Sequence, residues 1–479
     1  MIQSFFHTSI NGNIYLYNDN HRLSLLAHPE FEKAYEKSTD VDSYYSKKYA
    51  YLESHGFFEK SKLTDFRLLD ESIVRDNIIH TKQIVFETTE HCNLNCTYCS
   101  QGELYESCNT RNGKNINIHS AIKLLKYIFD LKPKYYKNKM FISFYGGEAL
   151  LNINFIKRIV EFTKQLNAEK RIELEYSMTT NATLLHKYID FFVENKFSLL
   201  ISLDGNEENH SYRLFCKNKK NSFQRVIKNI DMIQRDYPDY FDSRINFNAV
   251  LHNRNSVKQI YEFIYTRYNK IPRIAELNMR DINSDNKKTL ESMFHSKLKS
   301  EVEYQKEESD LSRITHSESF LYSELTNYLK YCSINYYISN LNAMLPIVET
   351  ILPTGTCTPF SKKIFLTNHD QLLPCERINY KYSLGKVNNN VEINIPEITQ
   401  KYNFYYMQLK KSCQTCYSYR FCGSCLFHLT NIDKAGTDEF VCNSLFDQKS
   451  FKKKMLTIFS FLEKYPSDFS EILENVVIE

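Results

Sequence analysis

The thirteen cysteines are the residues of this 479-residue chain whose type and spacing point most directly to chemistry. In a first group, Cys92, Cys96 and Cys99 are separated by three and two residues and follow a stretch that predicts a β-strand. Three thiolates on one loop form a soft ligand set suited to zinc or iron. A zinc site or a complete iron–sulfur cluster needs a fourth ligand, for which Cys108 is a candidate. The alternative is a cluster with one open iron that binds a small molecule.

A second group lies near the C-terminus and contains seven cysteines: Cys357, Cys375, Cys413, Cys416, Cys422, Cys425 and Cys442. A zinc ribbon uses four ligands and would leave three of these unused. Two four-iron clusters need eight ligands, so seven thiolates nearly fill them. Closely spaced cysteines in a chain with no visible secretion signal favour metal binding over disulfides.

Composition narrows the class of protein. The chain is 42% hydrophobic and 25% charged, which is typical of a globular protein. Its net charge of +4 arises from 61 basic and 57 acidic side chains, a balance that predicts neither a nucleic-acid nor a membrane partner. No apolar run is long enough to cross a membrane, and the first residues lack a signal peptide, so we expect a cytoplasmic location.

Alternating strands and amphipathic helices, which begin at residue 81, must position the first cysteine group. The expected strands are Gln83–Thr88, Phe141–Tyr145, Ile172–Met178, Ser198–Leu203, Arg244–Val250 and Arg273–Asn278. The clearest helix follows Ser222, a good N-cap, and carries its apolar residues on one stripe. Six such units predict an α/β fold with a parallel sheet or incomplete barrel, and functional residues at the C-terminal ends of its strands.

Residues 1–80 have a different pattern and predict a separate module. Asn13–Tyr17 and Arg22–Leu26 are expected to form a hairpin. Two helices should follow, at Pro29–Lys37 and Ser43–His55, the second ending at Gly56 as a C′ glycine.

Short motifs follow several predicted strands. Gly146 and Gly147 would let the backbone approach a ligand closely, and Glu148 could accept a hydrogen bond from an ammonium group. The alternative is that these residues form an ordinary turn between a strand and a helix. The next strand gives Ser177-Met-Thr-Thr-Asn181, and the one after it ends in Leu-Asp204-Gly, followed by His210 and Arg213. A lone arginine at such a place is more often a surface charge.

Together with Cys-x3-Cys-x2-Cys, these motifs resemble the radical S-adenosylmethionine (SAM) enzymes. The resemblance implies a 4Fe–4S cluster on Cys92, Cys96 and Cys99 whose free iron binds SAM, with a 5′-deoxyadenosyl radical as the product of SAM cleavage. It further implies that the SAM-binding residues are Tyr98, Gly146, Gly147, Glu148, Ser177, Asn181, Asp204 and Arg213. Ala182 departs from the pattern, because the family usually has glycine there.

The second cysteine group resembles SPASM, an auxiliary-cluster extension of radical enzymes that modify peptides. The first gap of 17 residues, a missing glycine before Cys375 and a last tight gap of two residues depart from its pattern. The resemblance implies an outer cluster on Cys413, Cys416, Cys422 and Cys442, and an inner cluster on Cys357, Cys375 and Cys425. The fourth inner position falls to Cys332 or stays open. Glu376 takes the place of a proposed general base, with a solvent-facing glutamate as the alternative.

The sequence therefore predicts a peptide maturase with SAM and three 4Fe–4S clusters. The expected parts are a winged-helix-like leader-recognition module at 1–80, a partial (β/α)6 barrel at 81–290, a helical connection at 291–345, an auxiliary-cluster domain at 346–450 and a terminal helix at 451–479. The expected partners are a ribosomally made precursor peptide, cross-linked through a thioether or C–C bond, and an electron donor such as flavodoxin or ferredoxin. The alternatives are an anaerobic sulfatase maturase that forms formylglycine and a non-enzymatic metal-stapled binding protein.

Overall fold

The computed structural model describes residues 2–21, 23–60, 66–106, 113–133, 136, 138–307, 309–332 and 352–475. The chain divides into two compact units. One comprises residues 1–69, 316–356 and 400–479, and the other comprises residues 70–315 and 357–399. In the part of the chain that the structure describes, no helix is long and apolar enough to span a membrane.

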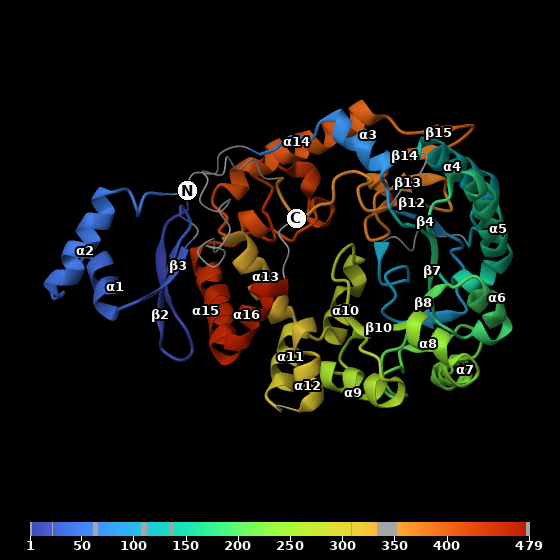
Figure 1. Cartoon of the computed structure of the whole chain (residues 1–479), viewed down its shortest axis with the longest axis horizontal. Coiled ribbons are helices and arrows are strands. Elements are labelled where there is room, and N and C mark those ends of the chain that lie inside the picture. Colours follow the sequence, from blue (N-terminus) through green and yellow to red (C-terminus); the bar gives the residue numbers. More distant parts are fainter. Residues whose placement is uncertain are drawn as a thin grey trace. The chain divides into compact units, whose positions relative to one another are not determined.

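A large, mainly parallel sheet forms the core of the second unit (Figure 1). All six predicted strands are present with slightly different ends: β4 (Gln83–Glu87), β6 (Met140–Tyr145), β7 (Leu174–Thr180), β8 (Ser198–Ser202), β10 (Ile245–Leu251) and β11 (Arg273–Glu276). They are parallel and adjacent in the order β11-β10-β8-β7-β6-β4. Their inward-facing apolar residues, such as Ile84, Phe86 and Ile142, are completely buried.

The sheet continues beyond β4 into the C-terminal part of the chain, which the sequence did not predict. β12 (Ile364–Leu366) pairs in parallel with β4, so that Ile364 lies opposite Ile84. Antiparallel pairing then adds β13 (Gln371–Leu373), β14 (Gly385–Val387) and β15 (Val391–Glu392). The segment that carries Cys375 and Glu376 is therefore fixed to the same sheet as the first cysteine loop.

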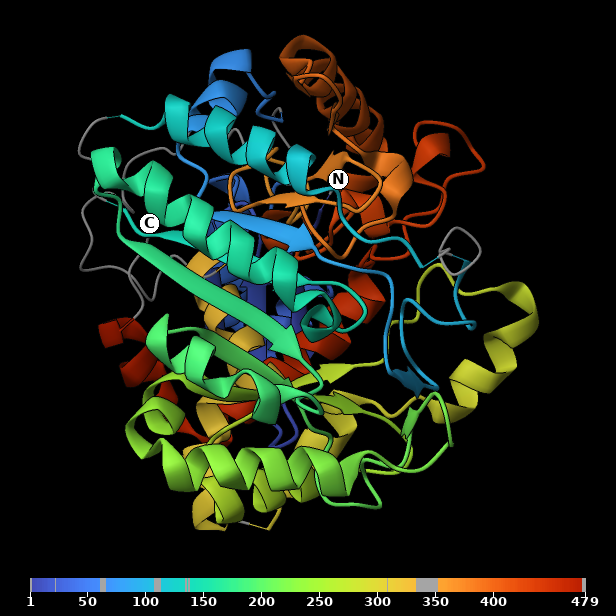
Figure 2. The same ribbon diagram turned by 90° about the vertical axis from the view of Figure 1, so that its right-hand side faces the viewer.

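Helices connect the parallel strands and cover one face of the sheet (Figure 2). They are α4 (Ile118–Leu131), α5 (Ile153–Lys170), α6 (Ile189–Glu194), α7 (Phe223–Asp236), α8 (Pro238–Arg244) and α9 (Val257–Tyr268). α3 (Glu71–Ile79) precedes the first strand, and α10 (Lys287–Met293), α11 (Lys297–Gln305) and α12 (Asp310–Ile314) follow the last. The predicted stripe of α7 is buried through Phe223, Val226 and Ile230.

Ser222 corrects one expectation about α7. It occupies the N-cap position, but its side chain makes no capping hydrogen bond. Its Oγ instead donates to the carbonyl oxygen of Arg213 at 2.8 Å. This residue therefore supports the segment that carries the predicted SAM-binding arginine.

The first unit is built around a three-stranded antiparallel sheet: β1 (Phe5–Thr8), β2 (Ile14–Asn18) and β3 (Leu23–Ala27). The predicted hairpin is the β2–β3 pair, and the two predicted helices are α1 (Pro29–Tyr35) and α2 (Ser43–Ser54). Gly56 adopts φ +75°, as a C′ glycine should.

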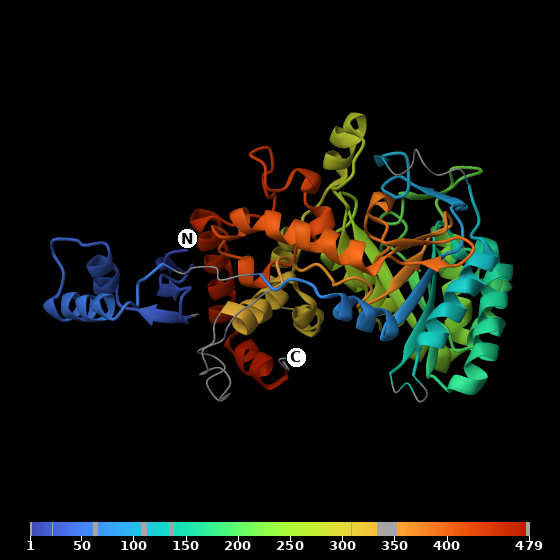
Figure 3. The same ribbon diagram turned by 90° about the horizontal axis from the view of Figure 1, so that it is seen from above.

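Helices α1 and α15 (Gln448–Lys464) lie on the two sides of this small sheet (Figures 1 and 3), and aromatic side chains form the contacts with both. Phe6 packs on Phe31 of α1. Phe5 and Tyr17 pack on Phe451 of α15. The described part of the unit also contains α13 (Phe320–Cys332) and α16 (Pro466–Asn475), and α14 (Ile395–Cys413) leads into the second cysteine group.

Candidate functional site

The first cysteine loop is held by a short two-stranded sheet. β5 (Leu94–Cys96) pairs antiparallel with β9 (Arg213–Phe215), and Cys96 lies directly opposite Arg213. The backbone N–H of Cys99 then donates to the carbonyl oxygen of Cys96 at 3.0 Å, which forms a tight turn between these two cysteines. The loop that presents the three thiols is therefore fixed at both ends.

The three thiols lie near enough to affect one another electrostatically. Burial raises the pKa of Cys92, and the nearby Glu148, Cys96 and Cys99 raise it further. Burial also raises the pKa of Cys96 to about 12, although the Arg213 guanidinium opposes this rise. Buried thiols become thiolates when a cationic group compensates their charge, so this donor set fits a cluster of iron ions. Among the described residues, no three Cys, His, Asp or Glu side chains gather tightly enough to share one metal ion.

The Gly-Gly-Glu motif serves the chain's own backbone. Gly146 has φ +133°, and a Cβ at Gly147 would lie 2.3 Å from the carbonyl oxygen of His91. The two glycines therefore allow the segment before Cys92 to cross the end of β6 closely. The structure shows close approach of the cysteine loop, and close approach of a ligand to these glycines stays a prediction.

Glu148 is buried among hydrogen-bond donors of the chain. Its carboxylate accepts from Thr180 Oγ1 and the Asn181 backbone N–H, both at 2.7 Å, and from the Leu150 N–H at 3.1 Å. Burial raises the pKa of Glu148, whereas these hydrogen bonds lower it. This carboxylate ties together the ends of β6 and β7.

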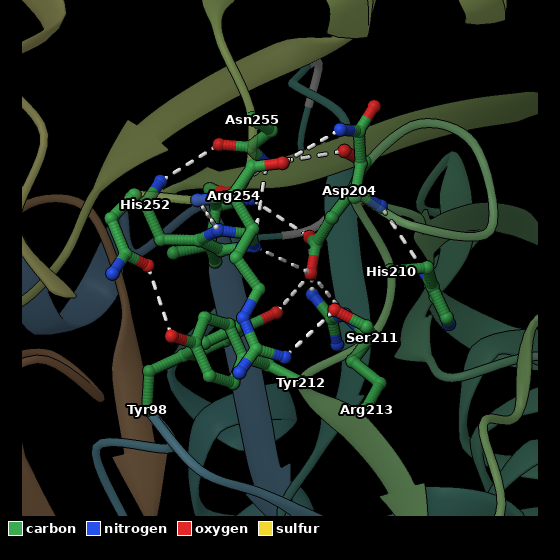
Figure 4. A network of polar contacts seen from close by, with 12 residues as sticks. Tyr98, Asp204, His210, Ser211, Tyr212, Arg213, His252, Arg254 and Asn255 are labelled. Carbon is green, nitrogen blue, oxygen red and sulfur yellow. Dashed lines mark hydrogen bonds and ion pairs between the residues drawn. The ribbon is translucent and has the colours of Figure 1, made fainter.

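Asp204 is the centre of a buried polar network (Figure 4). Its carboxylate accepts from Arg213 Nε at 2.8 Å and Nη2 at 3.0 Å. The Tyr98 hydroxyl donates to the same carboxylate, and the backbone N–H of Val250 donates at 2.9 Å. The side chain of Asp204 is completely buried and that of Arg213 is 8% exposed. Bidentate bonding fixes the plane of the guanidinium as well as its position.

The charges in this network stabilise each other. Burial raises the pKa of Asp204, but the Arg213 guanidinium and the hydrogen bonds from His252 and Arg213 outweigh burial and hold that pKa well below its usual range. Burial lowers the pKa of Arg213, yet Asp204 outweighs it and holds that pKa well above the usual value. The pair is therefore ionised, and Arg213 brings a fixed positive charge close to Cys96.

A cavity of about 760 Å³ opens beside the cysteine loop within the second unit. Its lining includes these residues predicted from the sequence: Cys92, Cys96, Tyr98, Cys99, Gly146, Gly147, Ser177, Asn181, Arg213 and Glu376. Glu148 and Asp204 are not among its lining residues, so their part in SAM binding stays a prediction. The structure thus places ten predicted residues around one space.

Inside this cavity, Ser177 and Asn181 are already oriented by neighbours. Ser177 Oγ lies 2.6 Å from Ser143 Oγ, and Asn181 Nδ2 donates to Asn93 Oδ1 at 2.9 Å. Ala182, where the resembled family has glycine, is buried with φ 62°. The backbone of this segment therefore keeps the left-handed conformation without a glycine.

The sequence reasoning missed several polar residues that line the same cavity: Ser143, Ser198, Asn246, Asn248, Arg273, Glu276, Lys363 and Arg377. The available signal was Asn246 and Asn248 at alternate positions of a strand that is otherwise apolar. Lys363 Nζ donates to both carboxylate oxygens of Glu376, each at 3.1 Å. Glu376 therefore carries a cationic partner, and its carboxylate faces the cavity rather than bulk solvent.

The second cysteine group contains a compact quartet in the first unit. Burial raises the pKa of Cys413, and Cys416, Cys422 and Cys442 all raise it further. The four thiols that the resemblance assigns to an outer cluster therefore lie near enough to affect one another electrostatically, and the cluster itself stays a prediction. Cys357 and Cys375 belong to the second unit and Cys425 to the first, so their grouping stays a prediction. Cys108 and the side chain of Cys332 lie outside the described residues.

The quartet is packed against the N-terminal sheet. Tyr417, next to Cys416, stacks on Phe451 with ring centroids 5.5 Å apart, and its hydroxyl accepts from the Gln3 N–H at 3.1 Å. Between Cys416 and Cys422, Arg420 forms an ion pair with buried Asp19 of the β2–β3 turn, at 3.4 Å. The quartet and this sheet therefore share one hydrophobic and polar core.

Comparison with known proteins identifies the domain. Residues 86–264 match the family model described as the radical SAM superfamily. A cysteine-type anaerobic sulfatase-maturating enzyme of Clostridium novyi is 32% identical over 184 residues, covering 38% of this chain and 46% of that protein. The radical SAM cyclopropyl synthase TigE of Paramaledivibacter caminithermalis is 26% identical over 176 residues, covering 36% of this chain and 35% of that protein. The chain thus spans less than half the length of either relative.

A solved structure, anSMEcpe with bound AdoMet, has the same fold. Its TM-score is 0.55 at 18% identity, covering 82% of this chain and all of that one. This likeness concerns the fold and agrees with the parallel sheet of the second unit. The chain therefore carries an enzymatic domain of the radical SAM superfamily.

Proposed function

We propose that this enzyme modifies a peptide by radical SAM chemistry, and that a ribosomally made precursor is its substrate. The observation that carries the proposal is the shared cavity, because the cysteine loop and the Glu376 carboxylate line the same space. With a 4Fe–4S cluster and SAM bound at Cys92, Cys96 and Cys99, that space would receive a 5′-deoxyadenosyl radical able to remove a hydrogen atom.

The chain's own residues would bind SAM and handle the proton. Arg213, pinned by Asp204, presents a cation of fixed orientation for the methionine carboxylate. Ser177 and Asn181 offer hydroxyl and amide groups in the same cavity. Forming a thioether or C–C cross-link removes two hydrogens from the peptide: one leaves as the abstracted atom, and the other as a proton and an electron. Glu376 would accept that proton, and the auxiliary clusters would take up the electron.

The cysteines of the C-terminal part would hold those auxiliary clusters. The mutual proximity of Cys413, Cys416, Cys422 and Cys442 supports the outer cluster. Cys357, Cys375 and Cys425 remain our proposal for the inner one. A flavodoxin or ferredoxin would supply the electron that starts each SAM cleavage.

The first unit would bind the leader part of the precursor. β3 pairs with β2 on one side, and its other edge pairs with no strand in the described residues. Leu26 on this strand is 70% exposed. An edge strand of this kind can accept an added strand from an extended peptide. This feature supports a winged-helix-like leader-recognition module.

A sulfatase maturase is the second candidate, favoured by the sequence similarity to the clostridial sulfatase-maturating enzyme. That function would oxidise a cysteine or serine to formylglycine in the same cavity. It gives no role to the exposed edge of β3. The two candidates therefore differ in whether that edge matters for turnover.

The test is co-expression with each small peptide encoded beside the enzyme, followed by mass spectrometry. A loss of 2 Da per cross-link is expected for the precursor, and no change in any encoded peptide would refute this function. Leu26→Glu should abolish leader binding and modification. Ile10→Glu is the matched control, because Ile10 is 77% exposed at the β1–β2 turn. Conversion of a sulfatase-derived Cys or Ser peptide, equal in both variants, would instead establish the second candidate.

A further inference from the structure

The β9 hairpin is a surface feature that touches the first cysteine loop directly. The backbone N–H of Cys216 donates to the carbonyl oxygen of Asn93 at 3.0 Å, and Cys216 Sγ donates to that of Cys92 at 3.5 Å. The hairpin turns at Lys219, which adopts φ 54°. Two hydrogen bonds of Cys216, the residue just before the tip, therefore hold the hairpin against Cys92 and Asn93.

The tip is strongly cationic. Lys217, Lys219 and Lys220 are all exposed. No ion pair links any of the three to an acidic side chain in the described part of the chain. Two acidic residues lie on the adjoining loop: Glu207, which accepts a hydrogen bond from Gln224 Nε2 at 2.9 Å, and Glu208, which is exposed.

A second set of cations lies beside the same loop. Asn93 Nδ2 donates to Thr183 Oγ1 at 2.8 Å, which places the segment that continues to His186 next to the cysteine loop. Burial lowers the pKa of His186, and Arg225, Lys187 and Lys228 lower it further. Arg225, Lys187 and Lys228 are exposed, and no acidic side chain contributes to the lowered pKa of His186. The field at this surface is therefore positive.

We propose that these six side chains, Lys187, Lys217, Lys219, Lys220, Arg225 and Lys228, form the docking surface for an acidic one-electron carrier protein that reduces the radical cluster. We call them the cationic surface. The inference rests on the proposed function, because only a radical cluster needs this electron. One electron passes from the reduced carrier to the oxidised 4Fe–4S cluster, and the carrier leaves oxidised by one electron.

Charge and position together favour this occupant. Exposed charges of one sign raise the association rate of a protein of opposite charge, and salt suppresses that effect. The hairpin presents its exposed lysines directly after Cys216, whose thiol is hydrogen-bonded to the carbonyl oxygen of Cys92. The cavity, in contrast, lies on the loop's inner side, where SAM and substrate are expected to bind.

The experiment compares two reductants on the reconstituted full-length enzyme. Reduced flavodoxin serves as the acidic carrier, and reduced methyl viologen, a small cation, bypasses any docking surface. The readout is the initial rate of 5′-deoxyadenosine formation from SAM without peptide. In Lys217→Glu/Lys219→Glu/Lys220→Glu, we expect the flavodoxin-driven rate to fall by about tenfold or more at low salt, and the viologen-driven rate to stay within about twofold. The wild-type flavodoxin rate should fall with added salt, and the variant rate should not.

A control variant carries the same change in charge elsewhere. Lys82, Lys126 and Lys299 are exposed residues of the same unit, and Lys82→Glu/Lys126→Glu/Lys299→Glu should keep the wild-type flavodoxin rate. Equal losses with both reductants, or an unchanged flavodoxin rate, would overturn the proposal. Equal losses would mean that the hairpin only supports the cysteine loop.

Binding gives a readout that needs no turnover. Oxidised flavodoxin should bind the wild type and the control variant, and bind the hairpin variant at least tenfold more weakly. If no chain cleaves SAM with viologen, the proposed function fails, while the binding result still decides the docking surface. If an acidic peptide loses affinity for the hairpin variant and flavodoxin does not, the surface belongs to a peptide and the proposal is wrong.

Discussion

The two cysteine sites of this chain are supported in different ways. Three thiols on the first loop lie beside a cavity, and the nearest charged support is the buried Asp204–Arg213 pair. The four thiols of the quartet lie among aromatic side chains, such as Tyr417 stacked on Phe451. An open site with three ligands and a fixed cation suits binding and chemistry on a small molecule. A site with four ligands inside a core suits a group that stays bound and stabilises the surrounding fold.

The largest expected effect separates these roles. Cys92→Ala/Cys96→Ala/Cys99→Ala should remove about four irons and abolish 5′-deoxyadenosine formation. Cys413→Ala/Cys416→Ala should also remove about four irons but retain SAM cleavage, while hydrogen exchange accelerates in β1–β3. Iron analysis, product quantification and exchange mass spectrometry check these outcomes. Loss of SAM cleavage in both variants would mean that the second cysteine site is also needed for SAM cleavage and is not only a structural support.

The next effect tests whether substrate shares the cavity of the first site. Glu376→Gln keeps the shape of the side chain but cannot accept a proton. We expect modified peptide to fall by about 10²–10⁴-fold, while 5′-deoxyadenosine formation without peptide is unchanged. Glu392→Gln, on exposed β15, is the control and should leave both rates unchanged. If modified peptide and 5′-deoxyadenosine fell together, Glu376 would instead be needed for SAM binding or cleavage.

A smaller effect concerns the charged support itself. Asp204→Asn leaves the Arg213 guanidinium buried with no opposite charge, so the free energy of unfolding should fall by about 3–5 kcal/mol. Urea denaturation measures this change. Asp236→Asn removes an exposed partner of Arg235 and should cost far less, because water screens this surface pair. Similar losses in the two variants would show that the Asp204 pair contributes no more than a surface pair.

The smallest effect tests backbone strain at the strand end beside the first loop. Ala182→Gly should remove the strain of the left-handed conformation, which costs alanine roughly 1–2 kcal/mol. Part of this gain is lost because glycine raises the conformational entropy of the unfolded chain. A net increase in stability of below about 1 kcal/mol is expected in the same denaturation experiment. Ala121→Gly, inside α4, should destabilise instead. A destabilised Ala182→Gly would mean that the packing of the methyl group outweighs the strain.

The sequence predicted what is encoded locally. The six parallel strands follow from alternating apolar segments, and the cysteine loop with its supporting motifs follows from short spacings near strand ends. The partners of those motifs could not be predicted in the same way. Glu148 accepts hydrogen bonds from Thr180 and Asn181, and Gly147 lies against the backbone of His91. In both cases the partner belongs to a different strand end or loop that the fold brings close. The direction of a side chain depends on such tertiary contacts, and the spacing of residues in one sequence does not reveal them.

The quartet and the small N-terminal sheet show the same limit over a longer range. The Gln3 N–H and the Tyr417 hydroxyl are 414 positions apart in sequence. Residues 1–69 look separable in the sequence, yet they form one compact unit with residues 400–479. Deleting them would remove part of a core, so point variants on β3 are the cleaner test of leader binding.

That long-range packing also has a consequence for the order of synthesis. β1 leaves the ribosome long before its aromatic partners Tyr417 and Phe451 have been made. At about 5–20 residues per second, the wait between Gln3 and Tyr417 is roughly 20–80 s. During that interval the residues of the parallel sheet are complete and can fold, while Phe5 and Tyr17 have no core to enter. The face of the nascent N-terminal sheet that carries Phe5 and Tyr17 therefore stays uncovered until Phe451 has been made.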